Sequence, residues 1–201
     1  MPRREIDEQL LINSALEEFT LNSFEQASVN KIIANAKIAK GSFYYRFPNK
    51  YSLYIYLLKE ADKKKWEFIN NEINQDDASG KDDIFALFIR QAESGVRFAA
   101  AYPQYFKLGK MLSKEKGSPL YNQVLGDLKI TDVSGLSRII EEAYSTGTFG
   151  SEYSIEFVNK LLTSMFFSFD EIFFRDEEFE LGKAMAYLHE FSKFLMHGLK
   201  K

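Results

Sequence analysis

The side chains best suited to contact another molecule are concentrated in one basic and aromatic segment, residues 37–50. Phe43 and Phe47 are four residues apart, which on a helix places both on one inward face. The opposite face then carries polar, basic and aromatic side chains: Lys40, Ser42, Tyr45 and Arg46. A short helix with such an outer face is typical of nucleic-acid recognition.

The first residues of this short helix are the candidates for reading DNA sequence. Lys40, Gly41 and Ser42 begin it, and the N-terminal end of a recognition helix meets base edges in the major groove. Lys40 has the donors to bond O6 or N7 of guanine, whereas Ser42 can bond more than one base. Gly41 permits close approach of the backbone because it has no Cβ.

A second short helix must position this one. Apolar side chains repeat at i, i+3, i+4 and i+7 just upstream, which predicts one buried helical face: Val29, Ile32, Ile33 and Ala36. Ser28 precedes them, where its hydroxyl can accept from an unpaired N–H of the first turn. Lys37-Ile38-Ala39 interrupts the pattern, and Pro48 cannot continue a helix. Two short helices joined by a tight turn predict a helix-turn-helix.

The segment Ala39–Lys50, AKGSFYYRFPNK, resembles the recognition-helix signature of the TetR family of bacterial transcriptional regulators. The resemblance covers roughly residues 6–53, and the apolar positions of its first helix also match: Leu11, Ile12, Ala15, Leu16 and Phe19. It implies phosphate contacts from Ser28, Tyr44, Tyr45 and Lys50. For Tyr44 the alternative is a core aromatic side chain.

The chain departs from this family at two positions. Ser23 and Lys37 stand where the family often has glycine. A left-handed conformation at Lys37, in the turn between the two helices, would cost about 1 kcal/mol.

The charge distribution also favours DNA contact by this segment. The net charge of the whole chain is −3, but residues 26–66 contain nine Lys or Arg against only Glu60 and Asp62. This basic block coincides with the predicted helix-turn-helix and is suited to contact phosphates. Taken alone, Lys63-Lys64-Lys65 is equally explained as a solvated face.

Nothing in the sequence predicts an enzyme. The chain has no Cys and two His, and neither His has Asp or Glu at ligand spacing, so we expect no metal and no cofactor. Gly147-Thr148-Phe149-Gly150 predicts only a turn, since no strand precedes it. No signal peptide or membrane-spanning run is found, which predicts a cytoplasmic chain without membrane contact.

The hydrophobic pattern predicts an all-α fold of about nine helices. Besides the two short helices, these cover residues 5–21, 50–74, 81–101, 104–112, 119–144, 154–174 and 177–199, the fifth of them bent near Gly126 or Ser134-Gly135. The long helix from Lys50 would leave the N-terminal helix-turn-helix domain, here called the head, and enter the C-terminal helical domain, here called the body. We expect Trp66 and Ile69 in the core. We predict a DNA-binding domain at 1–48 and an effector-binding and dimerisation domain at 49–201.

The body is richer in aromatic residues than a minimal core requires. Because family members bind small effectors between helices of this region, we predict a cavity for a small apolar or aromatic effector. Its candidate lining is Phe88, Phe98, Tyr102, Tyr105, Phe106, Tyr121, Phe166 and Phe169. Ordinary core packing is the alternative for each of them. Glu93 and Arg97 could add polarity to the cavity or form a surface pair.

The last two helices have wide apolar faces, which suit an isologous dimer built as a four-helix bundle. The candidate interface residues are Leu162, Met165, Leu188, Phe191 and Leu195. The alternative is a hairpin that packs only on its own chain.

The sequence therefore predicts a homodimeric, ligand-responsive transcriptional regulator that binds operator DNA. A repressor released by a small, largely apolar effector fits these features best. The alternatives are a DNA-binding protein without an effector and a small-molecule binding protein whose head no longer binds DNA.

Overall fold

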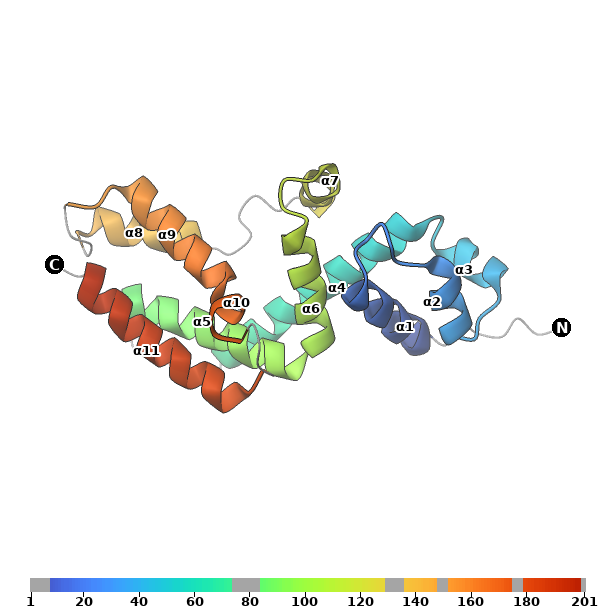
Figure 1. Cartoon of the computed structure of the whole chain (residues 1–201), viewed down its shortest axis with the longest axis horizontal. Helices are drawn as coiled ribbons and strands as arrows, with labels where there is room; N and C mark the ends of the chain where they lie inside the picture. The colour runs from blue at the N-terminus through green and yellow to red at the C-terminus, as the bar shows by residue number, and fades with distance from the viewer. Residues whose placement is uncertain (1–7, 74–83, 129–135, 148–151, 175–178, 200–201) are drawn as a thin grey trace. The chain divides into compact units, whose positions relative to one another are not determined.

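The computed structural model describes residues 8–73, 84–128, 136–147, 152–174 and 179–199, and every regular element within them is an α-helix. Figure 1 shows their course from the N-terminus to the C-terminus. In chain order they are α1 (Glu8–Leu21), α2 (Val29–Asn35), α3 (Lys40–Arg46), α4 (Lys50–Ile73), α5 (Ile84–Ala101), α6 (Pro103–Lys114), α7 (Pro119–Leu128), α8 (Leu136–Ser145), α9 (Ile155–Phe167), α10 (Phe169–Phe174) and α11 (Leu181–Leu199). The predicted all-α fold is confirmed.

The chain forms two compact units. The first covers residues 1–67 and 102–130, and the second covers 68–101 and 131–201. The predicted boundary between the DNA-binding and effector-binding domains lies between Pro48 and Asn49. It is a functional boundary, and packing does not show which segment binds DNA or an effector. That boundary stays a prediction.

One hydrophobic core holds the first unit together. It joins α1, α2, α3 and the first half of α4 to α6 and α7, and Figure 1 shows α1, α2 and α3 grouped beside the start of α4. All the apolar positions expected for the first helix are buried: Leu11, Ile12, Ala15, Leu16 and Phe19. Leu108 and Val124 bring α6 and α7 into the same core.

Capping side chains stand at the starts of α2, α4, α7 and α9. The Ser28, Ser118 and Ser154 hydroxyls each accept from a backbone N–H three residues on, at 3.4, 3.1 and 3.3 Å. At α4 the cap is reciprocal: Asn49 Oδ1 accepts from the Ser52 N–H at 2.8 Å, and Ser52 Oγ accepts from the Asn49 N–H at 3.3 Å. Such caps satisfy N–H groups that a helix start leaves unpaired.

The second unit has two smaller cores that share α11. In one, α8 and α9 pack with Phe191 and Leu195. In the other, α5 and α10 pack with Ala184 and Leu188. α11 runs beside α5 in this unit (Figure 1).

Two of the predicted helices are each two helices in the structure. The helix expected over 119–144 is α7 and α8, and the residues between them, 129–135, lie outside the described part. Of the two positions predicted for a bend, Gly126 lies within α7 and Ser134-Gly135 lies outside the described part.

The helix expected over 154–174 is divided at Ser168 into α9 and α10. Ser168 has φ −100° and ψ 5°, and its N–H bonds to the Ser164 carbonyl. Ile172 is exposed, whereas Phe169 and Phe173 pack against the core. The last helix begins at Leu181, not Glu177, and residues 175–178 are outside the described part.

Contrary to the prediction, Trp66 is not a core residue. Its side chain is 51% exposed on α4. The three-residue spacing from Ile69 correctly predicts one helical face, but it does not predict whether that face is covered. Ile69 is half-buried.

Candidate nucleic-acid interface

α2 is fixed to α1 by a serine and a glutamate. The Ser28 hydroxyl accepts from the Lys31 N–H, as predicted, and the Ser28 N–H donates to Glu18 Oε1 at 2.9 Å. Glu18 is buried, so its carboxylate holds the start of α2 at a set distance from α1. The sequence reasoning missed Glu18, because nothing in a first-helix pattern marks an acidic residue that bonds ten positions ahead.

The turn between α2 and α3 contains a left-handed residue, as anticipated. Lys37 has φ 53° and is the only non-glycine residue with positive φ in the described part of the chain. Its N–H bonds to the Ala34 carbonyl at 3.1 Å, and the Ile38 N–H bonds to the Ile33 carbonyl at 3.3 Å. These bonds close the end of α2 with a lysine where glycine is favoured.

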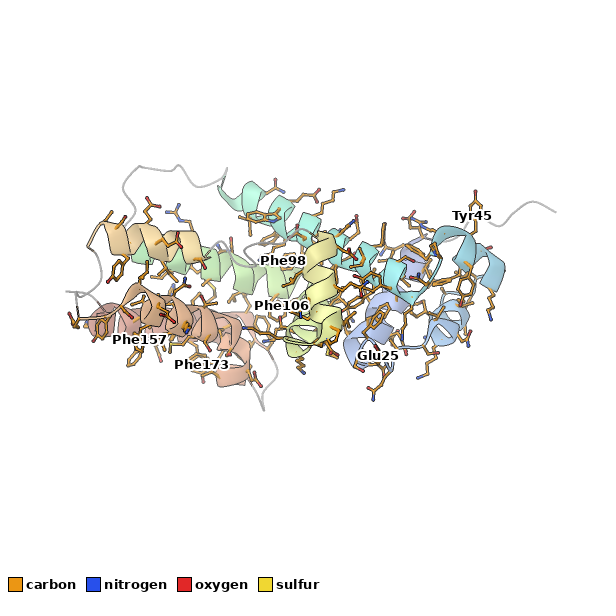
Figure 2. The ribbon with its side chains drawn as sticks, turned by 90° about the horizontal axis from the view of Figure 1, so that it is seen from above. Glu25, Tyr45, Phe98, Phe106, Phe157 and Phe173 are labelled. Atoms are coloured by element: carbon orange, nitrogen blue, oxygen red, sulfur yellow. The ribbon has the colours of Figure 1, made fainter. Side chains whose placement is uncertain are left out.

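α3 places its aromatic residues as the spacing predicts. Phe43 and Phe47 are buried, whereas Lys40 and Gly41 are exposed and Ser42 is half-buried. Tyr44 is 42% exposed and Tyr45 82%, and Figure 2 shows Tyr45 projecting away from the ribbon of α3. Tyr44 packs its ring edge-on against Phe43 but is not a core side chain. The outer face of α3 is therefore open to a partner.

Lys40 lies over the Tyr44 ring, with Nζ 5.9 Å from the ring centroid. The two residues are one helical turn apart, so this cation–π contact holds the ammonium against the surface of α3. A base or phosphate that binds Lys40 can take its ammonium from this position without disturbing the core.

Lys50 is bonded within its own chain. Its Nζ donates to the backbone carbonyls of Glu25 at 3.0 Å and Ala27 at 3.1 Å, and it lies 4.7 Å from the Phe24 ring centroid. These contacts tie the segment between α1 and α2 to the first turn of α4. An ammonium has three donors, so one remains for a phosphate.

Contrary to the prediction, Arg46 does not lie on the outer face of α3. Its guanidinium forms an ion pair with Glu8 of α1 and lies over the rings of Phe47 and Tyr56. The hydrogen bond and charge of Arg46 lower the pKa of the Glu8 carboxyl below its usual range. Burial, above all, raises the pKa of Tyr56, whose hydroxyl also bonds to Glu8.

The predicted effector-binding residues fall into both compact units. Tyr102, Tyr105, Phe106 and Tyr121 are half-buried in the first unit, whereas Phe98 and Phe169 are in the second. The side chains of Phe88 and Phe166 are outside the described set. Tyr105 and Tyr121 pack against the first unit's core, and Phe169 packs 4.9 Å from Phe173 by ring centroids. Core packing thus accounts for several of them.

In the first unit, Tyr102 and Tyr105 also share a lysine. Lys64 Nζ lies 5.4 Å from the Tyr102 ring centroid and 5.6 Å from that of Tyr105. Burial raises the pKa of the Tyr105 hydroxyl.

The predicted dimer residues are used within one chain. Leu162, Leu188, Phe191 and Leu195 are buried in the two cores of the second unit, and Met165 packs against one of them. Their packing agrees with the intramolecular alternative and leaves little of these five side chains for a partner. The exposed side of α11 is different, because Phe194 is 68% exposed.

Within the described residues, no group of three or more His, Asp and Glu is placed to hold a metal ion. The same part of the chain contains no helix long and apolar enough to cross a membrane.

The capped α2, the tight turn and the exposed basic start of α3 define a helix-turn-helix DNA-binding protein. Residues 11–57 match the family model described as "Bacterial regulatory proteins, tetR family". The predicted resemblance to the TetR family is thus confirmed over this DNA-binding segment. No curated protein matches the chain by sequence.

Solved structures share the fold over nearly the whole chain. A TetR family transcriptional regulator from Chloroflexus aurantiacus is 19% identical with a TM-score of 0.78, covering 96% of this chain and 93% of that one. The fatty acid degradation regulator FadR from Bacillus halodurans is 19% identical with a TM-score of 0.63, covering 96% and 99%. A ketosteroid transcriptional regulator of Mycobacterium tuberculosis is 11% identical with a TM-score of 0.68, covering 98% and 97%.

Proposed function

We propose that the protein is a homodimeric, ligand-responsive repressor that binds operator DNA through α3 and is released by a small, largely apolar effector. The observation that carries DNA binding is the exposed outer face of α3, with Lys40 and Tyr45 beside a capped α2. Phosphate and base contacts have separate roles in such an interface, since the first set affinity and the second set sequence preference.

Substitution of two lysines tests this division of roles. Duplex DNA selected by the wild-type protein from a random pool serves as the probe, with unselected duplex as the control. Lys40→Ala should relax preference at one base pair of each half-site, at a cost of about 1–3 kcal/mol there. Lys50→Ala should weaken binding to both duplexes and reduce the slope of log affinity against log salt by about 1. Equal losses on both duplexes for both variants would refute the assignment.

Lys50 has a second role that this experiment must separate. Because its ammonium bonds to the carbonyls of Glu25 and Ala27, Lys50→Ala also loosens the segment before α2. Lys50→Arg is the matched control, since it keeps the charge but changes the donor geometry. A phosphate role predicts that Lys50→Arg keeps the salt slope, whereas Lys50→Ala reduces it by about 1.

An effector in the body is supported by its aromatic content and by chemistry named for similar proteins. The name of one similar structure refers to fatty acid degradation, and that of another to a ketosteroid. Fatty acids and steroids are both largely apolar. A thermal-shift screen with fatty acids and steroids tests for binding to this chain. An effector coupled by about 1–3 kcal/mol would lower operator affinity about 5- to 150-fold, and operator DNA would weaken the effector by the same factor. Equal effector affinity with and without operator would exclude such coupling.

Dimerisation is proposed through α9 and α11, on the side that one chain leaves uncovered. Two reading heads that span about one DNA turn, or a multiple, require such an assembly. Phe194→Glu would place a charge in this interface and should halve the mass measured by light scattering. Leu21→Glu is the matched control, because Leu21 is an equally exposed apolar residue of α1. A Phe194→Glu protein that keeps the mass of two chains removes this face of α11 from the interface.

The competing function is a small-molecule binding protein whose head does not bind DNA. The engagement of Lys50 by backbone carbonyls favours it, because one predicted phosphate contact is partly occupied. Salt-dependent binding of the selected duplex separates the two functions.

A further inference from the structure

Three helices of the first unit meet at Arg46. Arg46 is the last residue of α3, and its guanidinium contacts Glu8 at the start of α1 and Tyr56 in α4. We propose that Arg46, Glu8 and Tyr56 form a clamp that fixes the C-terminal end of the recognition helix, so that Arg46 acts in DNA reading as a positioning residue. The proposal rests on DNA binding by α3.

The clamp is closed on several sides. Glu8 Oε1 accepts from the Arg46 guanidinium and also from the Tyr56 hydroxyl at 3.2 Å. The guanidinium carbon lies 5.5 Å from the Phe47 ring centroid and 5.8 Å from that of Tyr56. The Phe47 and Tyr56 rings pack edge to face at 5.4 Å. Arginine is suited to such a site because its planar group can pair with a carboxylate and stack on rings at once.

The recognition helix needs such an anchor because its own ends are weak. α3 has seven residues, and a helix this short is marginal without tertiary contacts. Its N-cap, Ala39, makes no side-chain bond to the first turn. Its C-cap, Phe47, has φ −122° and ψ 104°, so the chain leaves the helix immediately after Arg46. Phe43 and Phe47 hold the inner face, and the clamp adds the contact that resists rotation at the end.

The same contacts argue against Arg46 as a phosphate ligand. A phosphate at the guanidinium would meet the negative Glu8 carboxylate, which is already paired with Arg46 and repels a second anion. The Arg46 pair holds the pKa of Glu8 below its usual range, so this carboxylate is charged at neutral pH. Lys37, Lys40 and Lys31 remain as the exposed basic side chains of α2, the turn and α3.

Four variants of the full-length protein test the clamp on two DNA probes. The probes are the duplex selected by the wild-type protein and an unselected duplex, and the variants are Arg46→Lys, Arg46→Gln, Glu8→Gln and the double variant Glu8→Gln/Arg46→Gln. A positioning role predicts that Arg46→Lys lowers affinity for the selected duplex about 3- to 10-fold, the effect of losing a partly exposed pair and its stacking. Because the charge is kept, its affinity for unselected duplex and its salt slope should not change.

The double variant provides the decisive comparison. If Arg46 acts through Glu8, Arg46→Gln should lose no further preference for the selected duplex in the Glu8→Gln background. Lys59→Gln, at an exposed lysine of α4 outside the clamp, measures the effect of removing one positive charge. If instead Arg46→Gln lowers the salt slope by about 1 beyond this control and equally in both backgrounds, Arg46 is a phosphate contact and the clamp role is wrong.

A readout without DNA separates failure of the clamp from failure of DNA binding. Amide hydrogen exchange of residues 43–47 in the free protein should accelerate to the same extent in Arg46→Gln, Glu8→Gln and the double variant. Unchanged exchange in all three would overturn the clamp even if the protein binds DNA. A wild-type protein that enriches no duplex would overturn DNA binding, and with it the role of Arg46 in reading.

Discussion

The two compact units differ in the polar contacts that hold each one together internally. In the first, polar side chains join segments far apart in sequence at set distances. Ser28 bonds to Glu18, Lys50 bonds to the carbonyls before α2, and the Tyr51 hydroxyl donates to Asp127 Oδ2 at 2.7 Å. These bonds are directional, so they set the angles between helices as well as their separation.

Aromatic rings pack in both units, but among the described residues fewer polar bonds join distant segments of the second. Phe173 stacks on Tyr187 at 5.0 Å between ring centroids and lies 4.9 Å from Phe169. A polar link also joins α11 to α5, where His189 Nε2 lies 2.7 Å from Glu93 Oε1. The directional bonds of the first unit thus favour one fixed geometry, as DNA reading requires.

The largest expected effect tests whether the two units unfold separately. Leu53 in α4 and Leu188 in α11 are both buried, one in each unit. Leu53→Ala and Leu188→Ala should each cost about 2–5 kcal/mol by removing packed methyl groups. In calorimetry each variant should lower the transition of its own unit. If both lower one common transition, the units unfold together and the comparison applies to packing only.

A smaller effect compares the same cap in both units. Ser28 caps α2 and Ser154 caps α9 through equivalent bonds to an N–H three residues on. Each Ser→Ala change should cost about 1 kcal/mol in urea unfolding. Ser28→Ala should in addition weaken DNA binding, whereas Ser154→Ala serves as its control. Equal DNA affinity in the two variants would contradict a role for the Ser28 hydroxyl beyond capping.

The next comparison concerns left-handed residues. The first unit uses Lys37 at φ 53°, and the second uses Gly147 at φ 71°. Lys37→Asn should stabilise the protein by up to about 1 kcal/mol, because asparagine tolerates this conformation better. Gly147→Ala should destabilise it by about 1 kcal/mol. Stabilisation by Gly147→Ala would show that this turn can adopt another conformation.

The smallest effect is a pH dependence of the Glu8 pair. Arg46 depresses the Glu8 pKa in the folded protein below the ordinary 4.5. A depressed pKa means that the pair stabilises the fold fully above about pH 4.5, and that this contribution is lost as pH falls through the lower folded value. Urea unfolding of wild type and Glu8→Gln should therefore differ at neutral pH and converge in acid. A difference that persists below the folded pKa would assign the effect to something other than the charge of Glu8.

Much of the head could be predicted from sequence because its signals are local. The i, i+4 spacing of Phe43 and Phe47, the Ser28 cap and the interruption at Lys37 each depend on neighbouring residues. The structure confirms all three. Local steric and hydrogen-bonding rules decide such features before tertiary packing begins.

Only the tertiary structure determines which group each long side chain contacts. Arg46 and Lys50 differ little in sequence context, yet one pairs with Glu8 and the other bonds to the carbonyls of Glu25 and Ala27. The break at Ser168 and the exposure of Trp66 and Ile172 likewise depend on which surfaces meet. Periodicity defines the face on which a residue lies, but burial and pairing are set by groups distant in sequence, and those distances exist only once the chain has folded.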